Sequence, residues 1–206
     1  MLVDLAGAVV AYLVGAFPTS YLMGRLVKGI DIRQHGSGNA GATNTARVVG
    51  TGPGLVVLLV DIGKGWGPVA CLAPWVQHGG GWLSGETAQA LFGFCAVCGH
   101  LWSPWLGFQG GKGVATATGV LLGLAPPVAG LAAVVWLAVA ATTRYVSVSS
   151  IAAVTVVPVL MALTARPLSW VMVSAVLCVL IVAKHRVNLV RLLRHEESRL
   201  GRQKVN

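Results

Sequence analysis

The chain has 206 residues, of which 55% are hydrophobic and only 10% are charged. A soluble domain carries roughly a quarter charged residues, so this composition excludes an ordinary soluble protein and predicts one all-helical membrane domain over 1–206. The net charge of +9 does not by itself indicate nucleic-acid binding, because basic residues accumulate on the cytoplasmic loops of membrane proteins.

Seven apolar runs predict a polytopic bundle of membrane helices, each needing about 20 residues to cross the hydrocarbon core. The runs cover 2–23, about 53–76, 88–106, 113–125, 128–142, 146–163 and 168–183. Pro126 and Pro127 mark a turn between the fourth and fifth runs, although these two short runs are alternatively one kinked helix. The first run has no basic residue before it and no small-residue cleavage site, so we interpret it as a retained span.

Basic residues set the expected orientation in the membrane. If the first loop is cytoplasmic, the opposite loops hold only Arg166, which predicts an external N-terminus and a cytoplasmic C-terminus. The tail 184–206 is expected to form a surface helix with Val187, Val190 and Leu193 on its apolar face. The cytoplasmic side then carries the tail together with Arg25, Lys28, Arg33, Arg47, Lys112 and Arg144.

The first cytoplasmic loop contains the segment 36–47, GSGNAGATNTAR, which consists almost wholly of small and polar residues. Glycine lets the backbone approach a ligand closely, and Ser37, Asn39 and Asn44 supply short hydrogen-bonding groups. Arg47 supplies a planar fork that suits a carboxylate or a phosphate. A flexible linker would need neither the two asparagines nor the arginine, so we interpret this segment as a ligand-binding loop.

A second glycine-rich segment, 108–116, reads FQGGKGVAT. The backbone of Gly110, Gly111 and Gly113, the charge of Lys112 and the N-terminus of the following helix predict binding of phosphate or acyl phosphate. It is not a Walker loop, because Leu106 stands where the first glycine is required and Gly113 where Ser or Thr binds magnesium. The alternative is a tight turn between helices with a snorkelling lysine.

Few polar residues lie inside the apolar runs. Asp61 and Lys64 share a helix face and can therefore pair. An ionisable residue inside a membrane span indicates function by default. We nevertheless favour a structural ion pair that packs two helices together. His100 precedes the second glycine-rich segment, and a structural and a ligand-binding interpretation stay equally open. The cysteines are interpreted as buried hydrophobic residues rather than disulfide or metal ligands; they are Cys71, Cys95, Cys98 and Cys178.

A third polar cluster is divided between two segments. Ser147, Ser149 and Ser150 begin the sixth run and either cap that helix or bind a ligand. His185 and Asn188 are three residues apart, so both can project from one helical face as a base or as hydrogen-bonding groups. The basic residues around them are alternatively only a cytoplasmic anchor.

Taken in order, these pieces resemble the acyl-phosphate-dependent glycerol-3-phosphate acyltransferases, the small polytopic family that begins bacterial phospholipid synthesis. The matching pieces are Pro18-Thr19-Ser20-Tyr21 with Gly24-Arg25, GSGNAGATN to Arg47, Asp61 with Lys64-Gly65, Gly99-His100, GGKGVAT, and His185-Arg186-Val187-Asn188 with Arg191. One departure is Gln109, where the family is expected to have a basic residue. The acyltransferase signature of a His and an Asp separated by four residues is absent, since Trp105 and Val190 stand at the required positions.

The resemblance implies seven membrane helices in the bacterial inner membrane, with three motif regions on the cytoplasmic side. It implies transfer of a fatty acyl group to glycerol 3-phosphate, with acyl phosphate as the donor rather than acyl-CoA or acyl carrier protein. No metal or nucleotide cofactor, no nucleic acid and no obligate protein partner is implied; the partners are the two substrates and membrane lipids. An anion transporter is the competing class, but the polar motifs lie at one face, and the halves show no internal repeat.

Roles follow from holding two anionic head groups together while the acyl chain stays in lipid. Acyl phosphate is already activated, so proximity supplies much of the rate, and either His185 or the donor phosphate takes the proton. Ser37 is expected to orient substrate rather than act as a nucleophile. The phosphate and oxyanion groups are expected to be Arg47, Lys112, Gly110, Gly111 and Gly113, and the acceptor groups Ser37, Gly38, Asn39, Asn44, His100, Ser149, His185 and Asn188.

Overall fold

The computed structural model describes residues 1–201 and contains only helices, turns and loops over that range. This confirms the all-helical class. The chain forms two compact units, the first over Met1–Leu124 and the second beginning at Ala125. The expectation of a single domain stays a prediction, and residues 202–206 of the basic tail lie outside the described residues.

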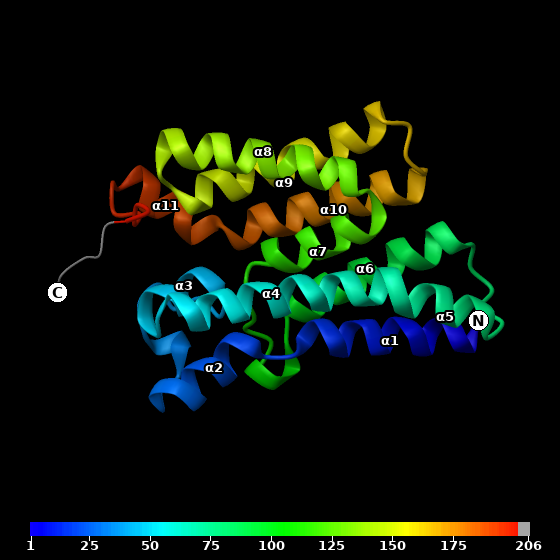
Figure 1. Cartoon of the computed structure of the whole chain (residues 1–206), viewed down its shortest axis with the longest axis horizontal. Helices are drawn as coiled ribbons and strands as arrows, with labels where there is room; N and C mark the ends of the chain where they lie inside the picture. Colours follow the sequence, from blue (N-terminus) through cyan, green and yellow to red (C-terminus); the bar gives the residue numbers. More distant parts are fainter. Residues whose placement is uncertain (202–206) are drawn as a thin grey trace. The chain divides into compact units, whose positions relative to one another are not determined.

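The first unit is built from two closely packed helix pairs (Figure 1). In these pairs α1 packs against α6 and α4 against α7. Glycines let the backbones approach: a Cβ at Gly15 would collide with the Ala96 carbonyl, and a Cβ at Gly65 with the Thr116 carbonyl. The elements are α1 (Leu2–Ala16), α2 (Thr19–Lys28), η1 (Ile32–Gln34), α3 (Ala42–Val48), α4 (Thr51–Gly67), η2 (Pro68–Leu72), α5 (Ala73–His78), α6 (Gly85–Leu101), η3 (Pro104–Leu106) and α7 (Val114–Leu124).

Two predicted boundaries differ from the structure in this unit. The first run is not one continuous helix, because Pro18 lacks an N–H group and the chain leaves helical geometry between α1 and α2. The third run ends at Leu101 rather than at 106, since Trp102 adopts φ −131° and a short 3-10 turn begins at Pro104. Pro18 and Ser103, one from each break, line the same cavity as Ala40 and Gly111 of the glycine-rich segments.

The second unit consists of α8 (Pro126–Thr143), α9 (Val146–Leu163), α10 (Leu168–Lys184) and α11 (Arg186–Leu193). Helix α9 packs against both α8 and α10 (Figure 1). Because α7 ends at Leu124 and α8 begins at Pro126, the predicted turn is confirmed and the fourth and fifth runs are separate helices. In the part of the tail that the structure describes, the helix α11 bends by 51° from α10 and exposes Val187, Val190 and Leu193.

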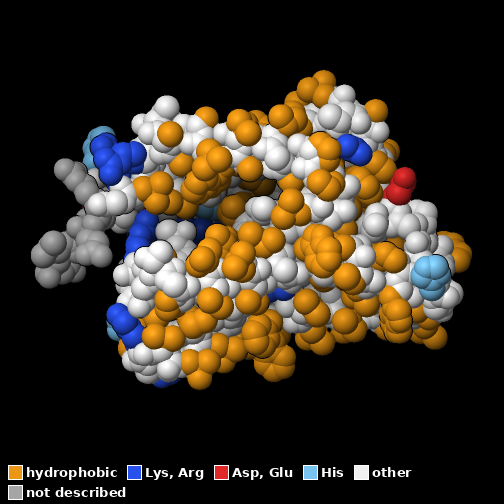
Figure 2. Space-filling model, in the orientation of Figure 1, with side chains coloured by type: hydrophobic (Ala, Val, Ile, Leu, Met, Phe, Trp, Pro, Cys, Tyr) orange, Lys and Arg blue, Asp and Glu red, His pale blue; other side chains and the backbone are white. Residues whose placement is uncertain are grey.

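Several helical segments suit a membrane by length and composition. Within residues 1–201 four qualify, and a fifth does so if α10 and α11 are counted as one bent span. Hydrophobic side chains cover much of the visible surface of each unit (Figure 2). This composition identifies a multi-pass membrane protein. The four segments are Leu2–Lys28, Thr51–His78, Pro126–Thr143 and Val146–Leu163.

Candidate active site

The first glycine-rich loop is held closed by the side chain of Asn44, in the first turn of α3. Its Oδ1 accepts a hydrogen bond from the Ser37 N–H at 2.9 Å, and its Nδ2 donates to the carbonyls of Ile32 and His35 at 3.2 and 3.0 Å. Only 1% of Asn44 is exposed. These contacts give Asn44 a scaffolding role. Its direct contact with a substrate stays a prediction and would require the loop to open.

Helix α3 is attached to α2 by two buried hydroxyl groups. Ser20 Oγ lies 2.7 Å from Thr45 Oγ1, which itself donates to the Gly41 carbonyl at 3.2 Å. Because the Thr45 hydroxyl has one proton, Ser20 is the donor of the first bond. This attachment sets the direction of α3, the helix that carries Arg47.

The remaining predicted groups of this loop are more accessible. Ser37 and Asn39 are half-buried, and Gly38 and Arg47 are exposed. The structure shows no hydrogen bond or ion pair from the Arg47 guanidinium to any residue within 1–201. Its fork is therefore available to an anion, as its predicted role requires.

The second glycine-rich segment is packed against the end of α6, which corrects one expectation. The N–H groups of Gly110 and Gly111 donate to the carbonyls of Leu101 and His100 at 3.3 and 3.1 Å. A Cβ on either glycine would collide with His100. These two amides therefore satisfy the C-terminal carbonyls of α6 and are not available to hold a phosphate or an oxyanion.

The rest of that segment keeps the arrangement expected from the sequence. Gly113 adopts φ +84°, which favours glycine, and α7 begins at the next residue, Val114. Lys112 is half-buried and lies directly before this helix start. A positive side chain and a helix N-terminus therefore adjoin in the chain, the combination that favours a bound anion.

Arg33 connects the turns that precede the two glycine-rich segments, and the sequence interpretation gave it no site role. Its Nε and Nη2 donate to the Asp31 carboxylate at 3.0 and 2.7 Å, while its Nη1 donates to the Leu106 carbonyl at 3.1 Å. Its guanidinium carbon also lies 5.5 Å from the centre of the Tyr21 ring. The hydrogen bonds from Arg33 hold the pKa of Asp31 below its ordinary value, which keeps the carboxylate charged.

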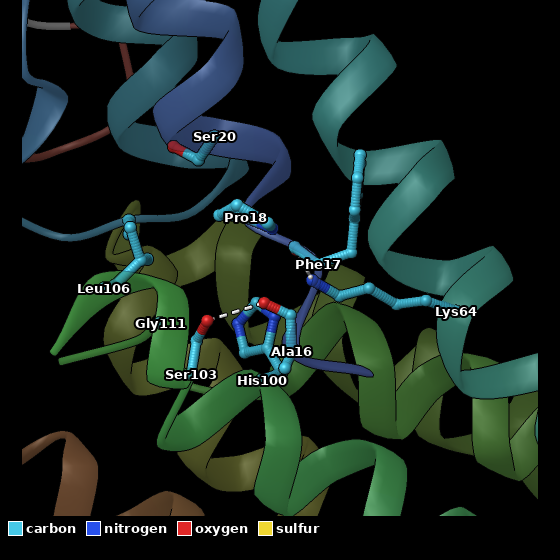
Figure 3. Close-up of a pocket in the computed structure, with 10 residues that line it drawn as sticks. Ala16, Phe17, Pro18, Ser20, Lys64, His100, Ser103, Leu106 and Gly111 are labelled. Atoms are coloured by element: carbon cyan, nitrogen blue, oxygen red, sulfur yellow. Dashed lines mark hydrogen bonds between the residues drawn. The ribbon is translucent and has the colours of Figure 1, made fainter. Parts of the chain in front are cut away.

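A small cavity in the first unit brings several polar residues together (Figure 3). Lys64 binds Asp61 with Nζ and Oδ1 2.9 Å apart, and His100 Nδ1 lies 4.0 Å from the same oxygen. The predicted pairing of Asp61 with Lys64 is therefore confirmed. The cavity is lined by Ala16, Phe17, Pro18, Ser20, Ala40, Lys64, His100, Ser103, Leu106 and Gly111.

In the second unit, His185 and Asn188 lie at the bend between α10 and α11, and both are buried. His185 Nδ1 is 2.8 Å from the carbonyl oxygen of Ile181. Since a carbonyl oxygen only accepts, Nδ1 carries the proton, and Nε2 carries the lone pair that an acceptor or a base needs. Asn188 Nδ2 donates to Glu197 Oε1 at 2.7 Å.

Glu197 connects two parts of the third polar cluster, and the sequence interpretation did not identify it. Its Oε1 also accepts a hydrogen bond from the Ser147 hydroxyl at 2.8 Å, so the start of α9 and α11 share one carboxylate oxygen. The segment after Glu197 is attached to the turn between α8 and α9, because Leu200 N donates to the Arg144 carbonyl at 2.7 Å. The sequence signal for this role was the acidic pair Glu196 and Glu197 in an otherwise basic tail.

The serines of α9 do not cap their helix. Within residues 1–201, no side chain caps α9, whose N-cap residue is Tyr145. Ser149 is fully buried and donates back to the Tyr145 carbonyl at 2.8 Å, while Ser150 Oγ accepts from Trp136 Nε1 at 3.2 Å. The capping interpretation is therefore wrong, and substrate contact by Ser149 stays a prediction.

Comparison with known proteins gives a consistent result over nearly the whole chain. Residues 5–195 match the family model described as glycerol-3-phosphate acyltransferase. A glycerol-3-phosphate acyltransferase of Halalkalibacterium halodurans is 42% identical over 198 residues, covering 94% of each chain. One of Desulforudis audaxviator is 47% identical over 194 residues, again covering 94% of each chain.

Two solved structures are also similar, both of PlsY, an integral membrane glycerol 3-phosphate acyltransferase. The glycerol 3-phosphate form superposes with a TM-score of 0.88 at 35% identity, and 96% of each chain is covered. The lysophosphatidic acid form superposes with a TM-score of 0.85 at 34% identity, covering 96% of this chain and 95% of the other.

Proposed function

The chain belongs to the glycerol-3-phosphate acyltransferase family, and we propose that it transfers a fatty acyl group from acyl phosphate to glycerol 3-phosphate. The products are 1-acyl-glycerol 3-phosphate (lysophosphatidate) and phosphate. The observation that carries this proposal is the near full-length match to PlsY in a glycerol 3-phosphate form and a lysophosphatidic acid form. These two molecules are the acceptor and the product of the first acyl transfer of phospholipid biosynthesis.

The transfer needs one bond exchange at the acyl carbon. A hydroxyl oxygen of glycerol 3-phosphate bonds to that carbon, the bond from the carbon to the phosphate oxygen breaks, and phosphate leaves with the electron pair. The hydroxyl proton goes to His185 or to the leaving phosphate. Because phosphate is a good leaving group, holding the two reactants together supplies much of the rate, and the residues named here require no metal or nucleotide.

The charged residues of the first unit are assigned to the phosphates. The exposed Arg47 fork suits bidentate binding, and Lys112 acts as a point charge beside the start of α7. Since the Gly110 and Gly111 amides are occupied by α6, stabilisation of the oxyanion is assigned to Lys112 and to the helix start after Gly113. Ser37, Gly38 and Asn39 then orient glycerol 3-phosphate.

His185 and Asn188 are assigned to the acceptor. The hydrogen bond from Nδ1 to Ile181 fixes the imidazole tautomer, so Nε2 can accept a proton or a hydrogen bond. Asn188 is oriented through its amide nitrogen by Glu197. The lack of an identified base partner for Ser37 among residues 1–201 agrees with direct transfer rather than an acylated serine.

The proposed topology has seven membrane helices, an external N-terminus and an active site facing the cytoplasm across the bacterial inner membrane. It is supported by helical structure within each of the seven predicted runs, the first of which is divided between α1 and α2. It is also supported by the concentration of Lys and Arg on alternate loops. The orientation is tested in a variant that lacks the four native cysteines, by labelling single cysteines placed at residues 2 and 201 from either side of sealed vesicles.

The function is tested with the purified chain, radiolabelled glycerol 3-phosphate and palmitoyl phosphate, in the presence of EDTA. Formation of labelled lysophosphatidate is the expected result. Palmitoyl-CoA supplied alone is expected to give no product, and activity with palmitoyl-CoA but not with palmitoyl phosphate would contradict the proposed donor. Uptake of glycerol 3-phosphate by vesicles without product would instead favour the transporter interpretation.

A further inference from the structure

We propose that Asp61 and Lys64 are positioning residues for acyl transfer, because this buried pair holds both glycine-rich loops of the first unit. The inference rests on the proposed function of those loops. It goes beyond the packing role that the sequence favoured for the pair.

Stability alone is a weak reason for this ion pair. Lys64 Nζ and Asp61 Oδ1 are 2.9 Å apart, and only 6% and 3% of the two side chains are exposed. Removing two charges from water costs about as much as their attraction returns, and apolar residues of similar volume often serve equally well. Ionisable residues within a membrane span are costly and mark function by default. The contacts of the pair therefore indicate its role.

Lys64 holds the break between α1 and α2. Its Nζ donates to the Phe17 carbonyl at 3.0 Å, and Ser103 Oγ donates to the neighbouring Ala16 carbonyl at 2.6 Å. Figure 3 shows the Lys64 side chain extending from its helix toward Phe17. The break leaves these carbonyls without a continuous helix to pair them. Lys64 and Ser103 therefore fix the direction in which α2 leaves α1.

The direction of α2 in turn sets the first loop. Ser20, in the first turn of α2, binds Thr45 through the buried hydroxyl pair, with 2.7 Å between their oxygen atoms. Thr45 lies two residues before Arg47 on α3. A displaced α2 would therefore move the proposed phosphate clamp. The connection runs from Lys64 through Phe17 and α2 to Arg47.

Asp61 lies beside His100, the residue that packs against the second loop. His100 Nδ1 lies 4.0 Å from Asp61 Oδ1, and the other ring nitrogen of His100 packs against the position of Gly111, where a Cβ would collide with it. The Gly111 N–H also donates to the His100 carbonyl at 3.1 Å. Since Lys112 follows Gly111, the placement of His100 helps to set the placement of Lys112.

The decisive variant is Asp61→Asn with Lys64→Met, which removes both charges and leaves neither unpaired. We expect it to keep the wild-type melting temperature within a few degrees but to lose turnover by about 100-fold, because a displacement of about 1 Å costs this much. The value of kcat should fall, since Arg47 and Lys112 are both displaced. A double variant with wild-type kcat and KM would overturn the proposal.

A charge-swapped variant separates pairing from positioning. Asp61→Lys with Lys64→Asp keeps one charge of each sign, but an aspartate at 64 cannot donate to the Phe17 carbonyl. We expect it to remain inactive. Recovery of wild-type activity would show that only the ion pair matters. It would contradict the proposed role of the hydrogen bond from Lys64 to the Phe17 carbonyl.

Limited trypsin digestion tests the displacement of the two loops without measuring enzyme activity. Trypsin cleavage after Arg47 and Lys112 is expected to accelerate in the double variant, while cleavage after the exposed Arg194 stays unchanged. Equal cleavage at all three sites in variant and wild type would contradict the proposal. If the double variant does not insert into the membrane, Ser103→Ala removes the other hydrogen bond at the α1–α2 break. We expect this variant also to lose turnover and to be cleaved faster after Arg47 and Lys112. Wild-type turnover and cleavage rates would contradict the proposal. Failure of wild-type protein to form lysophosphatidate would instead refute the proposed function.

Discussion

Glu197 Oε1 lies 2.7 Å from Asn188 Nδ2, and this hydrogen bond attaches the C-terminal segment to the helix that carries Asn188. The same oxygen accepts from Ser147 at 2.8 Å, so one carboxylate bridges α9 and α11. If a buried donor loses its charged partner, the fold is destabilised by the free energy of removing that donor from water. The bridge therefore links the fold of the second unit to its proposed chemistry.

Removing this carboxylate should weaken the second unit. Glu197→Ala is expected to lower the free energy of unfolding by roughly 1–3 kcal/mol, since Ser147 and Asn188 both lose an acceptor. Thermal unfolding in detergent measures the effect. The matched control is Glu196→Ala, because Glu196 is exposed and its side chain has no hydrogen bond to residues 1–201. Equal melting temperatures for the two variants would contradict the bridging role.

The proposed phosphate groups should affect turnover and not folding. Arg47→Ala and Lys112→Ala are each expected to reduce kcat/KM by about 100-fold or more, since each removes a charge from a phosphate or the oxyanion. Arg47→Lys should recover only part of the loss, because a lysine cannot bind two oxygens as a fork. Arg194→Ala, on an exposed residue of the tail, is the control. Near-normal transfer by both alanine variants would show that the site assignment is wrong.

Two variants of His185 distinguish an orienting role from that of a base. His185→Gln places an amide oxygen near the position of Nε2, whereas His185→Ala removes the acceptor. If His185 orients the acceptor while the donor phosphate takes the proton, the Gln variant retains activity within about tenfold and the Ala variant loses about 100-fold. Rates from pH 5 to 9 provide the measurement. Equal, severe losses in both variants, with loss of one limb of the pH profile, would identify His185 as the base instead.

The second loop should not tolerate a side chain at Gly111. A Cβ there would collide with the His100 ring, so Gly111→Ala is expected to cost about 1–3 kcal/mol through overpacking. The control is Gly63→Ala, where a Cβ meets no atom within 4 Å. That variant should be neutral or more stable by up to about 1 kcal/mol, since alanine favours a helix. Equal stability of the two variants would contradict the packing described for the second loop.

The Asp31–Arg33 pair should give the first unit a defined acid sensitivity. The pKa of Asp31 is lowered by its hydrogen bonds with Arg33, so its stabilising effect is fully present above the ordinary value of 3.8 and is lost as pH falls through the lowered value. Asp31→Asn should therefore lower the melting temperature at pH 7. The difference from wild type should shrink as the solution is acidified below pH 3.8. A difference that is independent of pH would exclude this linkage.

Local patterns in the sequence predicted most of the helices correctly. Hydrophobic run length located the helices, and the pair Pro126 and Pro127 located the turn before α8, because an apolar stretch or a missing N–H acts on its own segment. The pairing of Asp61 with Lys64 was also predictable, since residues three apart share a helix face. Arg47 and Lys112 stood out because polar segments are rare in this chain.

Hydrogen-bond partners distant in sequence were not predictable in this way. The amides of Gly110 and Gly111 looked available for a phosphate until the structure placed them against the carbonyls of α6. The hydrogen bonds by which the Asn44 amide closes its own loop were not predicted, and its contact with a substrate stays a prediction. Arg33 binds Leu106, 73 residues away, and no periodicity connects such positions.

The sequence by itself determined that this is a helical membrane protein of the glycerol-3-phosphate acyltransferase family, because composition, run length and ordered motifs are properties of the chain alone. Only the tertiary structure decided which polar groups remain available for chemistry. Each backbone amide and side chain has a limited number of hydrogen bonds, and the neighbours brought by folding determine which of them are occupied. That is why Lys64 emerged as the residue that holds the α1–α2 break, whereas Gly111 proved to be a site of close packing.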